Sequence, residues 1–238
     1  MPSNTGKGSV ILISGANRGI GASIAQELTS NGYRVSLGAR EPASLVERHG
    51  AENDNNLYSH FDAFDPETAL NWVQSTLRKF GRIDALVNNA GSAEQVTIQD
   101  DDDEALDRLW AVNVKAPLRL TRHCLPHLEK TGRGRIINIV SLSGKRVRNA
   151  FVGYNMTKFA VMGLTHTTRY ASWDKGVRVT AICPSFVSTD MSAYTNKVAS
   201  EEMIQPGTVA EVVKFAIELP NNAAIAELLV NCRLEEML

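Results

Sequence analysis

The sequence predicts an α/β protein built as one doubly wound domain, in which helices cover both faces of a parallel sheet of about seven strands. Three observations support this fold class. Short apolar, β-branched runs alternate with amphipathic helical patterns along the 238 residues, and this alternation is typical of parallel sheets with crossover helices. The first run ends in a glycine-rich turn that leads into a helix. No linker, repeat or low-complexity segment divides the chain, so we expect a single domain over residues 1–238.

The expected strands are short apolar runs bounded by turn residues. The first, Val10-Ile-Leu-Ile13, is too short for a helix and apolar on both faces, as in a buried parallel strand. The full set of expected strands covers residues 10–13, 34–37, 57–61, 85–88, 135–140, 177–183 and 227–232.

The expected helices combine apolar residues at helical spacing with recognisable ends. The first helix follows the glycine-rich turn and stops before Gly32. Asp65 is an N-cap with Pro66 at the first helical position. The segment from Thr208 to Glu211 has the pattern of a capping box that opens the last helix. The other helical patterns cover about 66–80, 103–129 and 154–173.

The composition is that of an ordinary globular protein. The chain has 25 Lys and Arg against 26 Asp and Glu, a formal net charge of −1, and 43% apolar residues. A charge this close to zero gives no electrostatic reason to expect nucleic acid or an anionic membrane as a partner. No stretch approaches about 18 uninterrupted apolar residues, so we expect no membrane-spanning helix.

The cysteines and the N-terminus favour the cytoplasm. Cys124, Cys183 and Cys232 are scattered and form no CxxC pair, which suits a reduced compartment. The opening residues, MPSNTGKGSV, are polar and lack the apolar core of a signal peptide. His123 and His127 have a spacing that could bind zinc, but no third ligand is evident. We therefore expect a cytoplasmic protein without a metal site.

A glycine-rich turn is the first functional signal. Gly15, Gly19 and Gly21 lie between the first strand and the first helix. Glycines there let the backbone approach a pyrophosphate at the helix N-terminus. The spacing differs from the more familiar G-x-G-x-x-G, and the alternative is a tight turn that needs glycine for positive φ. With a strand before it and a helix after it, the turn predicts dinucleotide binding.

The end of the second strand bears on the choice of dinucleotide. An acidic residue there would hold the ribose 2′-hydroxyl of NAD, but Ala39 occupies that place and Arg40 follows it. Arg18 lies inside the glycine turn. Two guanidinium groups near the adenosine ribose suit a 2′-phosphate, so NADP(H) is favoured. In the alternative, both arginines face solvent, Glu41 binds the ribose and the cofactor is NAD(H).

Five motifs follow one another between about residues 10 and 190. They are Ser14-Gly-Ala-Asn-Arg-Gly-Ile-Gly21, Asn88-Asn-Ala-Gly91, Asn113, Ser141 and Tyr154-x-x-x-Lys158. In this order they resemble the motifs of the short-chain dehydrogenases/reductases. Each motif is modest alone, and the set is highly specific. The resemblance implies a Rossmann-like fold, an oxidoreductase that interconverts small carbonyl and alcohol compounds by hydride transfer, and homodimers or homotetramers.

The resemblance also implies which residues bind the cofactor. Asp62 would contact adenine with Ala63 beside it, and the loop with Val187 and Thr189 would hold the nicotinamide carboxamide. Ser185 departs from the family, which has glycine after Pro184. The full implied set is Gly15, Asn17, Arg18, Gly19, Ile20, Gly21, Arg40, Asp62, Ala63, Asn89, Ala90, Gly91, Tyr154, Lys158, Pro184, Val187 and Thr189.

The candidate catalytic residues fit hydride transfer to a carbonyl. Negative charge then builds on the carbonyl oxygen, which needs a hydrogen-bond donor and then a proton. Tyr154 and Lys158 are i and i+4 on a helix, hence on one face, and a nearby cation favours the phenolate of a tyrosine, whose free pKa is about 10. We expect Tyr154 to be the general acid/base. Ser141 lies just past the fifth strand, where its hydroxyl can donate to the same oxygen.

Asn113 is the fourth candidate catalytic residue. Pro117 follows it by four positions and has no N–H to donate to the Asn113 carbonyl. The resemblance implies that this carbonyl binds a water molecule that passes protons from Lys158 to solvent. The alternative is an ordinary proline kink.

The substrate side is less informative. Residues from about 190 to 206 are polar and unpatterned, and we expect them to form the substrate lid. Lys145, Arg146 and Arg148 could steer an anionic substrate, although a solvated loop or a subunit contact is the preferred interpretation. Residues 226–231 resemble the ending of a branch that oxidises 3-hydroxy acids.

Together these features predict an NADP(H)-dependent oxidoreductase with Tyr154 as general acid/base. Three alternatives remain open. One is an NADP(H)-binding redox sensor without turnover, which would be expected to lack the tyrosine or the lysine. The second is an NAD(H)-dependent hydroxy-acid dehydrogenase. The third uses transient oxidation for epimerisation or dehydration, for which the chain is short.

Overall fold

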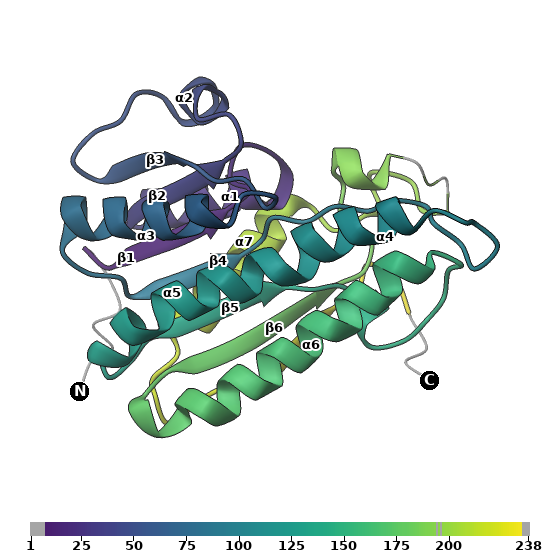
Figure 1. Cartoon of the computed structure of the whole chain (residues 1–238). Coiled ribbons are helices and arrows are strands. Elements are labelled where there is room, and N and C mark those ends of the chain that lie inside the picture. Colours follow the sequence, from purple (N-terminus) through teal and green to yellow (C-terminus); the bar gives the residue numbers. More distant parts are fainter. Residues whose placement is uncertain (1–7, 194, 196, 235–238) are drawn as a thin grey trace.

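A seven-stranded, all-parallel sheet forms the centre of the computed structural model, which describes residues 8–193, 195 and 197–234. The strand order is β3-β2-β1-β4-β5-β6-β7 (Figure 1). This confirms the predicted fold class. The strands are β1 (Val10–Ser14), β2 (Arg34–Ala39), β3 (Asn56–His60), β4 (Ala85–Asn88), β5 (Arg135–Ile139), β6 (Arg178–Pro184) and β7 (Glu227–Val230).

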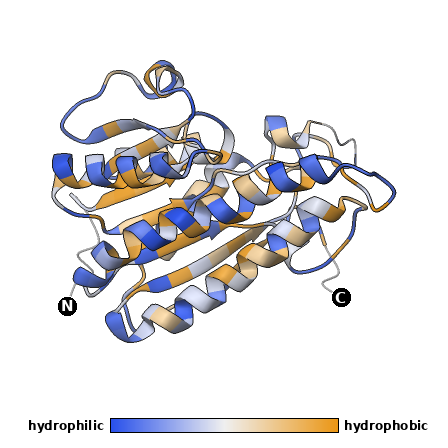
Figure 2. Ribbon diagram, in the orientation of Figure 1, coloured by the Kyte–Doolittle hydropathy of each residue, from blue (hydrophilic) through white to orange (hydrophobic). Residues whose placement is uncertain are grey.

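Helices cover both faces of the sheet because the central strands are apolar on both sides. In β1, Ile11 and Ile13 pack toward α1 (Gly19–Ser30) and α7 (Pro206–Glu218). Val10 and Leu12 pack toward the opposite layer. That layer contains α3 (Pro66–Phe80), α5 (Ala116–Lys130) and α6 (Val152–Ser172). In Figure 2 the strands are mostly orange, whereas α3 and α5 show blue residues on the side away from the sheet.

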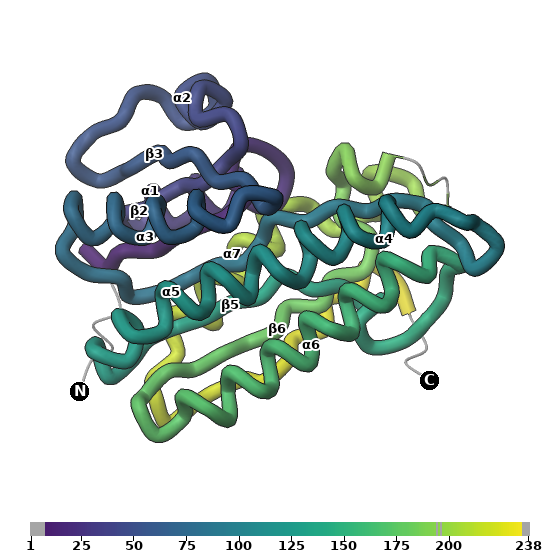
Figure 3. The backbone as a smooth tube through the Cα atoms, in the orientation of Figure 1, coloured from purple at the N-terminus to yellow at the C-terminus, as the bar shows by residue number. Residues whose placement is uncertain are grey.

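The strand order reverses at β1, and this reversal sets the place of the site. The chain builds β2 and β3 on one side of β1 and then crosses to add β4 to β7 on the other (Figure 3). Loops after β1 and β4 therefore leave in opposite directions. Open α/β sheets bind ligands at such a point, beyond the carboxyl ends of the strands.

The stretch predicted as one helix over 103–129 contains a π-helical segment. α4 (Asp103–Trp110) continues into the π-helix η1 (Ala111–Lys115) and then into α5. The Ala116 N–H donates to the Ala111 carbonyl, five residues back. Pro117 explains the irregularity, because it has no N–H and cannot continue the α-helical ladder toward Asn113.

One further expectation about helices was wrong, and one helix was not expected. The capping box at Thr208 does not form, because α7 begins earlier, at Pro206, with Gln205 as an N-cap that makes no side-chain capping bond. Proline presets the first helical φ and so starts the helix two residues before the predicted position. α2 (Ala43–His49) was not predicted, since it buries only Leu45 and lacks a clear apolar face.

None of the helices in residues 8–193 and 197–234 has the combination of length and apolar composition that crossing a bilayer requires.

Gly132 and Gly176, which lie just before the amino ends of β5 and β6, give a test of this packing. Gly176 has φ +81°, and a Cβ there would lie 2.0 Å from the Gly132 carbonyl oxygen. We expect Gly176→Ala to lower the free energy of unfolding by about 1–3 kcal/mol from backbone strain alone. Gly163 lies within α6, and a Cβ on it would have no neighbouring atom within 4 Å. Gly163→Ala should therefore raise the free energy of unfolding by about 0.5–1 kcal/mol. Urea unfolding measures both, and equal effects of the two substitutions would contradict the close contact between Gly176 and Gly132.

Candidate active-site cleft

A large cleft of about 1590 Å³ lies at the carboxyl edge of the sheet and collects most of the predicted site residues. Gly21 and Asn113 do not line it. The predicted residues that do line it are Gly15, Asn17, Arg18, Gly19, Ile20, Arg40, Asp62, Ala63, Asn89, Ala90, Gly91, Ser141, Tyr154, Lys158, Pro184, Val187 and Thr189.

The glycine turn needs its glycines for two physical reasons. Gly15 has φ +66° and Gly19 has φ +53°, a region that other residues rarely adopt. Gly21 has an ordinary φ, but a Cβ on it would lie 2.2 Å from the Gly15 carbonyl oxygen and 2.4 Å from Nδ2 of Asn89. Gly21 is therefore required for close packing, which explains why it does not line the cleft.

The N-terminus of α1 is suited to an anion. Its N-cap, Arg18, makes no side-chain capping bond, and the first turn has no acidic residue. The partial positive charge of the helix end is therefore not offset by a carboxylate within the helix. Gly19 and Ile20, the first residues of α1, line the cleft. Together with the glycine turn, this end of the helix would accommodate a pyrophosphate.

The Asn-Asn-Ala-Gly motif fastens the glycine turn to β4. The Ser14 hydroxyl accepts hydrogen bonds from the backbone N–H groups of Asn89 and Ala90, both at 3.0 Å. Nδ2 of Asn89 donates to the Ser14 and Gly15 carbonyls at 2.9 and 3.1 Å. Asn88 points into the core and donates to Oδ1 of Asn138 at 2.8 Å. Serine at position 14 thus supplies the hydroxyl that this junction requires.

Both predicted arginines line the cleft, but in different surroundings. Arg40 follows β2 and lines the cleft beside Glu41. Arg18 forms an exposed ion pair with Asp190, with 3.3 Å between Nη1 and Oδ2. Such an exposed pair contributes little to stability, so Arg18 can exchange this partner for a phosphate. Glu41, the alternative ligand for the ribose, also lines the cleft.

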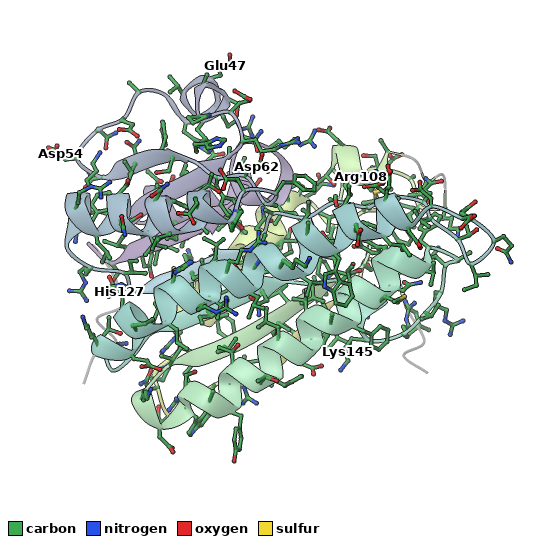
Figure 4. All side chains as sticks on the ribbon, in the orientation of Figure 1. Glu47, Asp54, Asp62, Arg108, His127 and Lys145 are labelled. Atoms are coloured by element: carbon green, nitrogen blue, oxygen red, sulfur yellow. The ribbon has the colours of Figure 1, made fainter. Side chains whose placement is uncertain are left out.

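Asp62 lies in a preformed turn after β3. Its Oδ1 accepts from the Phe64 N–H at 2.9 Å, and its own N–H donates to the Thr68 hydroxyl at 3.1 Å. Figure 4 shows Asp62 near the carboxyl ends of β1 and β2. The Asp62 backbone is thus held in place at the position predicted for adenine contact.

Ser141, Tyr154 and Lys158 all line the cleft, and Lys158 is the most buried of them. Its ammonium group lies 5.5 Å from the centroid of the Tyr154 ring and donates to the Ile139 carbonyl at 3.4 Å. Burial lowers the pKa of Lys158 from 10.5 to about 8. Ser141 follows β5, and its Oγ accepts from the Ser143 N–H at 3.1 Å. The hydroxyl hydrogen of Ser141 is therefore not used in that bond.

Asn113 acts behind the cleft through its side chain. Its amide pairs with the Ser92 backbone in both directions, each bond at 2.9 Å, and donates to the Thr157 hydroxyl at 3.1 Å. Thr157 precedes Lys158 on α6. Asn113 therefore joins the π-helical segment to the loop after β4 and to the helix that carries the lysine.

The loop after β6 is ordered without glycine at position 185. The Ser185 N–H donates to the Val230 carbonyl at 2.9 Å, and its hydroxyl accepts from the Cys232 N–H at 3.0 Å. Every residue with positive φ in the described part of the chain is a glycine, so Ser185 fits without strain. Thr189 faces the glycine turn: a Cβ on Gly19 would lie 3.3 Å from its Cγ2.

The predicted lid begins with the 3₁₀ turn η4 (Asp190–Ser192) and ends where α7 starts. Ile204, near the end of the lid, forms an isolated parallel bridge with Val187 in the loop that precedes the lid. Tyr194 and Asn196, two residues of the predicted lid, lie outside the described residues. Met191 and Lys197 line the cleft.

The three basic residues after Ser141 have different neighbours. Lys145 forms an ion pair with Glu227 of β7, 2.6 Å from Nζ to Oε2, and His166 contacts the same carboxylate. In the view of Figure 4, Lys145 lies on the opposite side of α6 from Asp62 and Arg108. Arg146 and Arg148 line the cleft. The loop is therefore neither wholly solvated nor wholly part of the site.

Several lining residues were not predicted. Arg108 and Glu94 form an ion pair at 2.8 Å at the cleft wall, and Phe186 and Arg233 line the cleft beyond β6 and β7. Phe186 lies next to Val187 within the predicted nicotinamide loop. Its position in the sequence could therefore have predicted that it lines the cleft. Arg233 follows the last strand, and nothing local marks it. Among the described residues, no group of three His, Cys, Asp or Glu is placed to hold a metal ion.

Known proteins share the sequence and the fold of this chain. Over 229 residues the chain is 50% identical to an agropine synthesis reductase of Rhizobium rhizogenes, covering 96% of this chain and 53% of that protein. The chain thus spans about half the length of this relative and of a second agropine synthesis reductase of the same species.

Two solved structures cover nearly the whole chain. An alcohol dehydrogenase from the archaeon Thermococcus sibiricus, complexed with 5-hydroxy-NADP, has a TM-score of 0.83 and 28% identity over 93% of this chain and 95% of that one. A 3-ketoacyl-(acyl-carrier-protein) reductase from Brucella melitensis, complexed with NADH, has a TM-score of 0.87 and 26% identity over 95% and 98%. The family model of the short chain dehydrogenases matches residues 9–199. The chain therefore belongs to the short-chain dehydrogenase family.

Proposed function

We propose that this oxidoreductase interconverts a carbonyl and an alcohol with NADP(H), and that Tyr154 is the general acid/base. One observation supports this most strongly: Tyr154, Ser141 and the buried Lys158 line the same cleft as the glycine turn. The redox-sensor alternative is less favoured, because a sensor has no need of a buried lysine beside a tyrosine. The high identity to an agropine synthesis reductase favours the reductive direction.

The residues present fit a nicotinamide dinucleotide. The glycine turn and the start of α1 would hold the pyrophosphate, Asp62 the adenine, and the loop with Val187 and Thr189 the carboxamide. Lys158, between Tyr154 and the Ile139 carbonyl, would reach the nicotinamide ribose. When bound, the cofactor supplies or accepts the hydride.

The chain's own residues would handle the oxygen and the proton. Ser141 donates a hydrogen bond to the carbonyl oxygen, which stabilises the negative charge that grows on it. Tyr154 donates its phenolic proton to the same oxygen as the alcohol forms. In the reverse direction, the phenolate takes that proton back.

Lys158 would favour the phenolate form of Tyr154. A cation beside a phenol favours its charged form, and a low-dielectric position strengthens the effect. The Asn113 side chain donates a hydrogen bond to the hydroxyl of Thr157, the residue before Lys158 on α6. We further propose that the Asn113 carbonyl, which Pro117 cannot serve as an α-helical donor, binds the water that returns protons to Lys158.

The proposed preference for NADP(H) rests on Arg18 and Arg40. Both line the cleft, and guanidinium groups pair well with phosphate oxygens. The solved relatives carry one cofactor of each type, so the arginines of this chain are what favours the 2′-phosphate.

Replacing Arg40 tests this preference. In Arg40→Asp, the ratio of kcat/KM for NADPH to that for NADH should fall by about 10-fold or more, because a charge-assisted bond to the 2′-phosphate is replaced by repulsion. Arg48→Asp, on the exposed side of α2 and away from the cleft, is the matched control. An unchanged ratio in Arg40→Asp would reject the assignment of NADP.

Replacing Tyr154 tests the general acid/base. Tyr154→Phe should lower kcat by at least about 10²- to 10⁴-fold, while NADPH binding, followed by fluorescence titration, stays near the wild-type value. Tyr170→Phe removes a hydroxyl from a side chain that is 92% exposed and should leave kcat unchanged. Full turnover in Tyr154→Phe would remove this residue from the mechanism.

Burial of Lys158 predicts opposite effects on activity and stability. Its pKa is lowered to about 8, so at pH 7 the folded protein holds a charge that burial disfavours. Lys158→Met should abolish turnover and raise the free energy of unfolding at pH 7 by up to about 3 kcal/mol.

The pH dependence of that gain follows from the sign of the shift. Above pH 8 the folded lysine loses its proton, and above about 10.5 the unfolded lysine does too. The penalty therefore fades with rising pH, and the stability gain of Lys158→Met should shrink between pH 8 and pH 10. Urea unfolding of the cofactor-free proteins measures this, and a variant less stable than wild type at pH 7 would contradict the prediction.

A further inference from the structure

Three arginines from two distant segments line the substrate side of the cleft. Arg146 and Arg148 come from the loop after η2 (Leu142–Gly144), and Arg233 follows β7. They share this cleft with Ser141 and Tyr154. Since 85 residues separate Arg148 from Arg233 in the sequence, only the fold brings them together.

The three guanidinium groups are close enough to influence one another. Partial burial, followed by the positive charges of Arg148 and Arg233, lowers the pKa of Arg146. The Arg233 guanidinium lies 5.7 Å from the centroid of the Phe186 ring, and its Nη1 donates to the Lys197 carbonyl at 3.4 Å. Each of the three side chains also has other contacts within the protein, so a ligand would join an ordered cluster.

The acidic residues that line the cleft within the described part of the chain lie elsewhere or have partners. Glu41 and Asp62 follow β2 and β3 at the adenosine side. Glu94 is paired with Arg108, and Asp190 with Arg18. The described lining residues therefore place an excess of positive charge beside Ser141 and Tyr154.

The loop that carries Arg146 and Arg148 is held at several points. Lys145 is fastened to Glu227. The Asn149 amide donates to the Ser143 hydroxyl at 3.3 Å, while its oxygen accepts from the Phe151 N–H at 2.9 Å and from Asn155 at 3.1 Å. These bonds join the loop to Ser143 on one side and to α6 on the other, and such preorganisation lowers the entropic cost of binding.

Arg233, the member of the cluster that follows the edge strand, lies far from the positions proposed for the cofactor's phosphates. The glycine turn follows β1 and Arg40 follows β2, whereas Arg233 follows β7. In the order β3-β2-β1-β4-β5-β6-β7, four strand spacings separate β1 from β7 and five separate β2 from β7. At about 4.8 Å for each spacing, these are distances of roughly 19 and 24 Å.

We propose that the substrate carries an anionic group, a carboxylate or a phosphate, that is bound by Arg146 and Arg148 with Arg233 beside them. Arginine binds both groups through paired N–H donors. The anion then fixes the orientation of the carbonyl toward Ser141 and Tyr154. This inference rests on the proposed function, since it names the substrate class of the same site.

Matched substrate pairs test the proposal and separate the two anions. Short 2-oxo acids are compared with their methyl esters, and dihydroxyacetone phosphate with dihydroxyacetone, with NADPH as reductant. In the wild type, the charged member of at least one pair should have a higher kcat/KM by about 10-fold or more. In Arg146→Gln/Arg148→Gln that preference should fall by about 10- to 100-fold, with the KM for NADPH unchanged.

Two control variants distinguish the loss of anion binding from a general effect of removing an arginine. Arg78→Gln removes an exposed arginine on α3, away from the cleft, and should keep the wild-type preference. Arg146→Lys/Arg148→Lys retains the charge without the paired donors and should fall between wild type and the glutamine variant. A preference for the neutral substrates, or a charge preference unaffected by Arg146→Gln/Arg148→Gln, would overturn the proposal.

Calorimetric titration with oxalate and inorganic phosphate, with and without NADPH, needs no turnover. Binding of at least one anion that weakens 10-fold or more in Arg146→Gln/Arg148→Gln supports the anion site, even if no carbonyl is reduced. In that case the proposed function fails and the site stands. Absence of arginine-dependent binding of either anion by the folded protein would overturn the site, whatever the reductase activity.

Discussion

The close approach of the glycine turn to the end of β4 is the packing constraint on which the cleft depends. Gly21 has no side chain where a Cβ would meet the Gly15 carbonyl and the Asn89 amide. This allows Asn89 to bond the carbonyls of Ser14 and Gly15. The start of α1 is thereby held beside the point where the strand order reverses, and the amide groups at the start of α1 lie at the edge of the cleft. A larger residue at position 21 would separate these two segments and displace the start of the helix.

A second constraint is electrostatic and concerns α6. The helix carries Lys158 into a buried position, where desolvation disfavours its charge. The energetic cost is local, while the two apolar layers on the faces of the sheet stabilise the rest of the fold. The Asn113 amide bonds Ser92 and Thr157 next to this lysine, so the π-helical segment and α6 are connected at the site. A lysine whose buried charge is destabilising by itself is thus surrounded by neutral hydrogen bonds that hold its helix in place.

The sequence was sufficient to predict the sheet and the glycine turn beside the cleft because the signals for both are local. Apolar runs marked the strands, and each site motif follows a strand or lies on a helix within a few residues of its neighbours. The wrong or missing predictions have two causes: a proline that overrides the local pattern, or a contact between residues far apart in the sequence. Pro206 displaced the helix start expected at Thr208, and Pro117 produced a π-helical segment that periodicity alone does not reveal. Arg233 enters the cleft only because β7 pairs with β6.

The part of the cleft around Ser141 depends on contacts between residues that are far apart in the sequence, and β7 is central to them. Glu227 in this strand fastens Lys145, the Val230 carbonyl accepts from Ser185, and Arg233 follows directly after its end. One edge strand therefore orders the loop after Ser141, the loop after β6 and the position of Arg233. Changes in this strand would alter these three parts of the cleft without touching the glycine turn. The glycine turn and the loops around Ser141 are thus held by separate parts of the same sheet, so one can vary while the other keeps its structure.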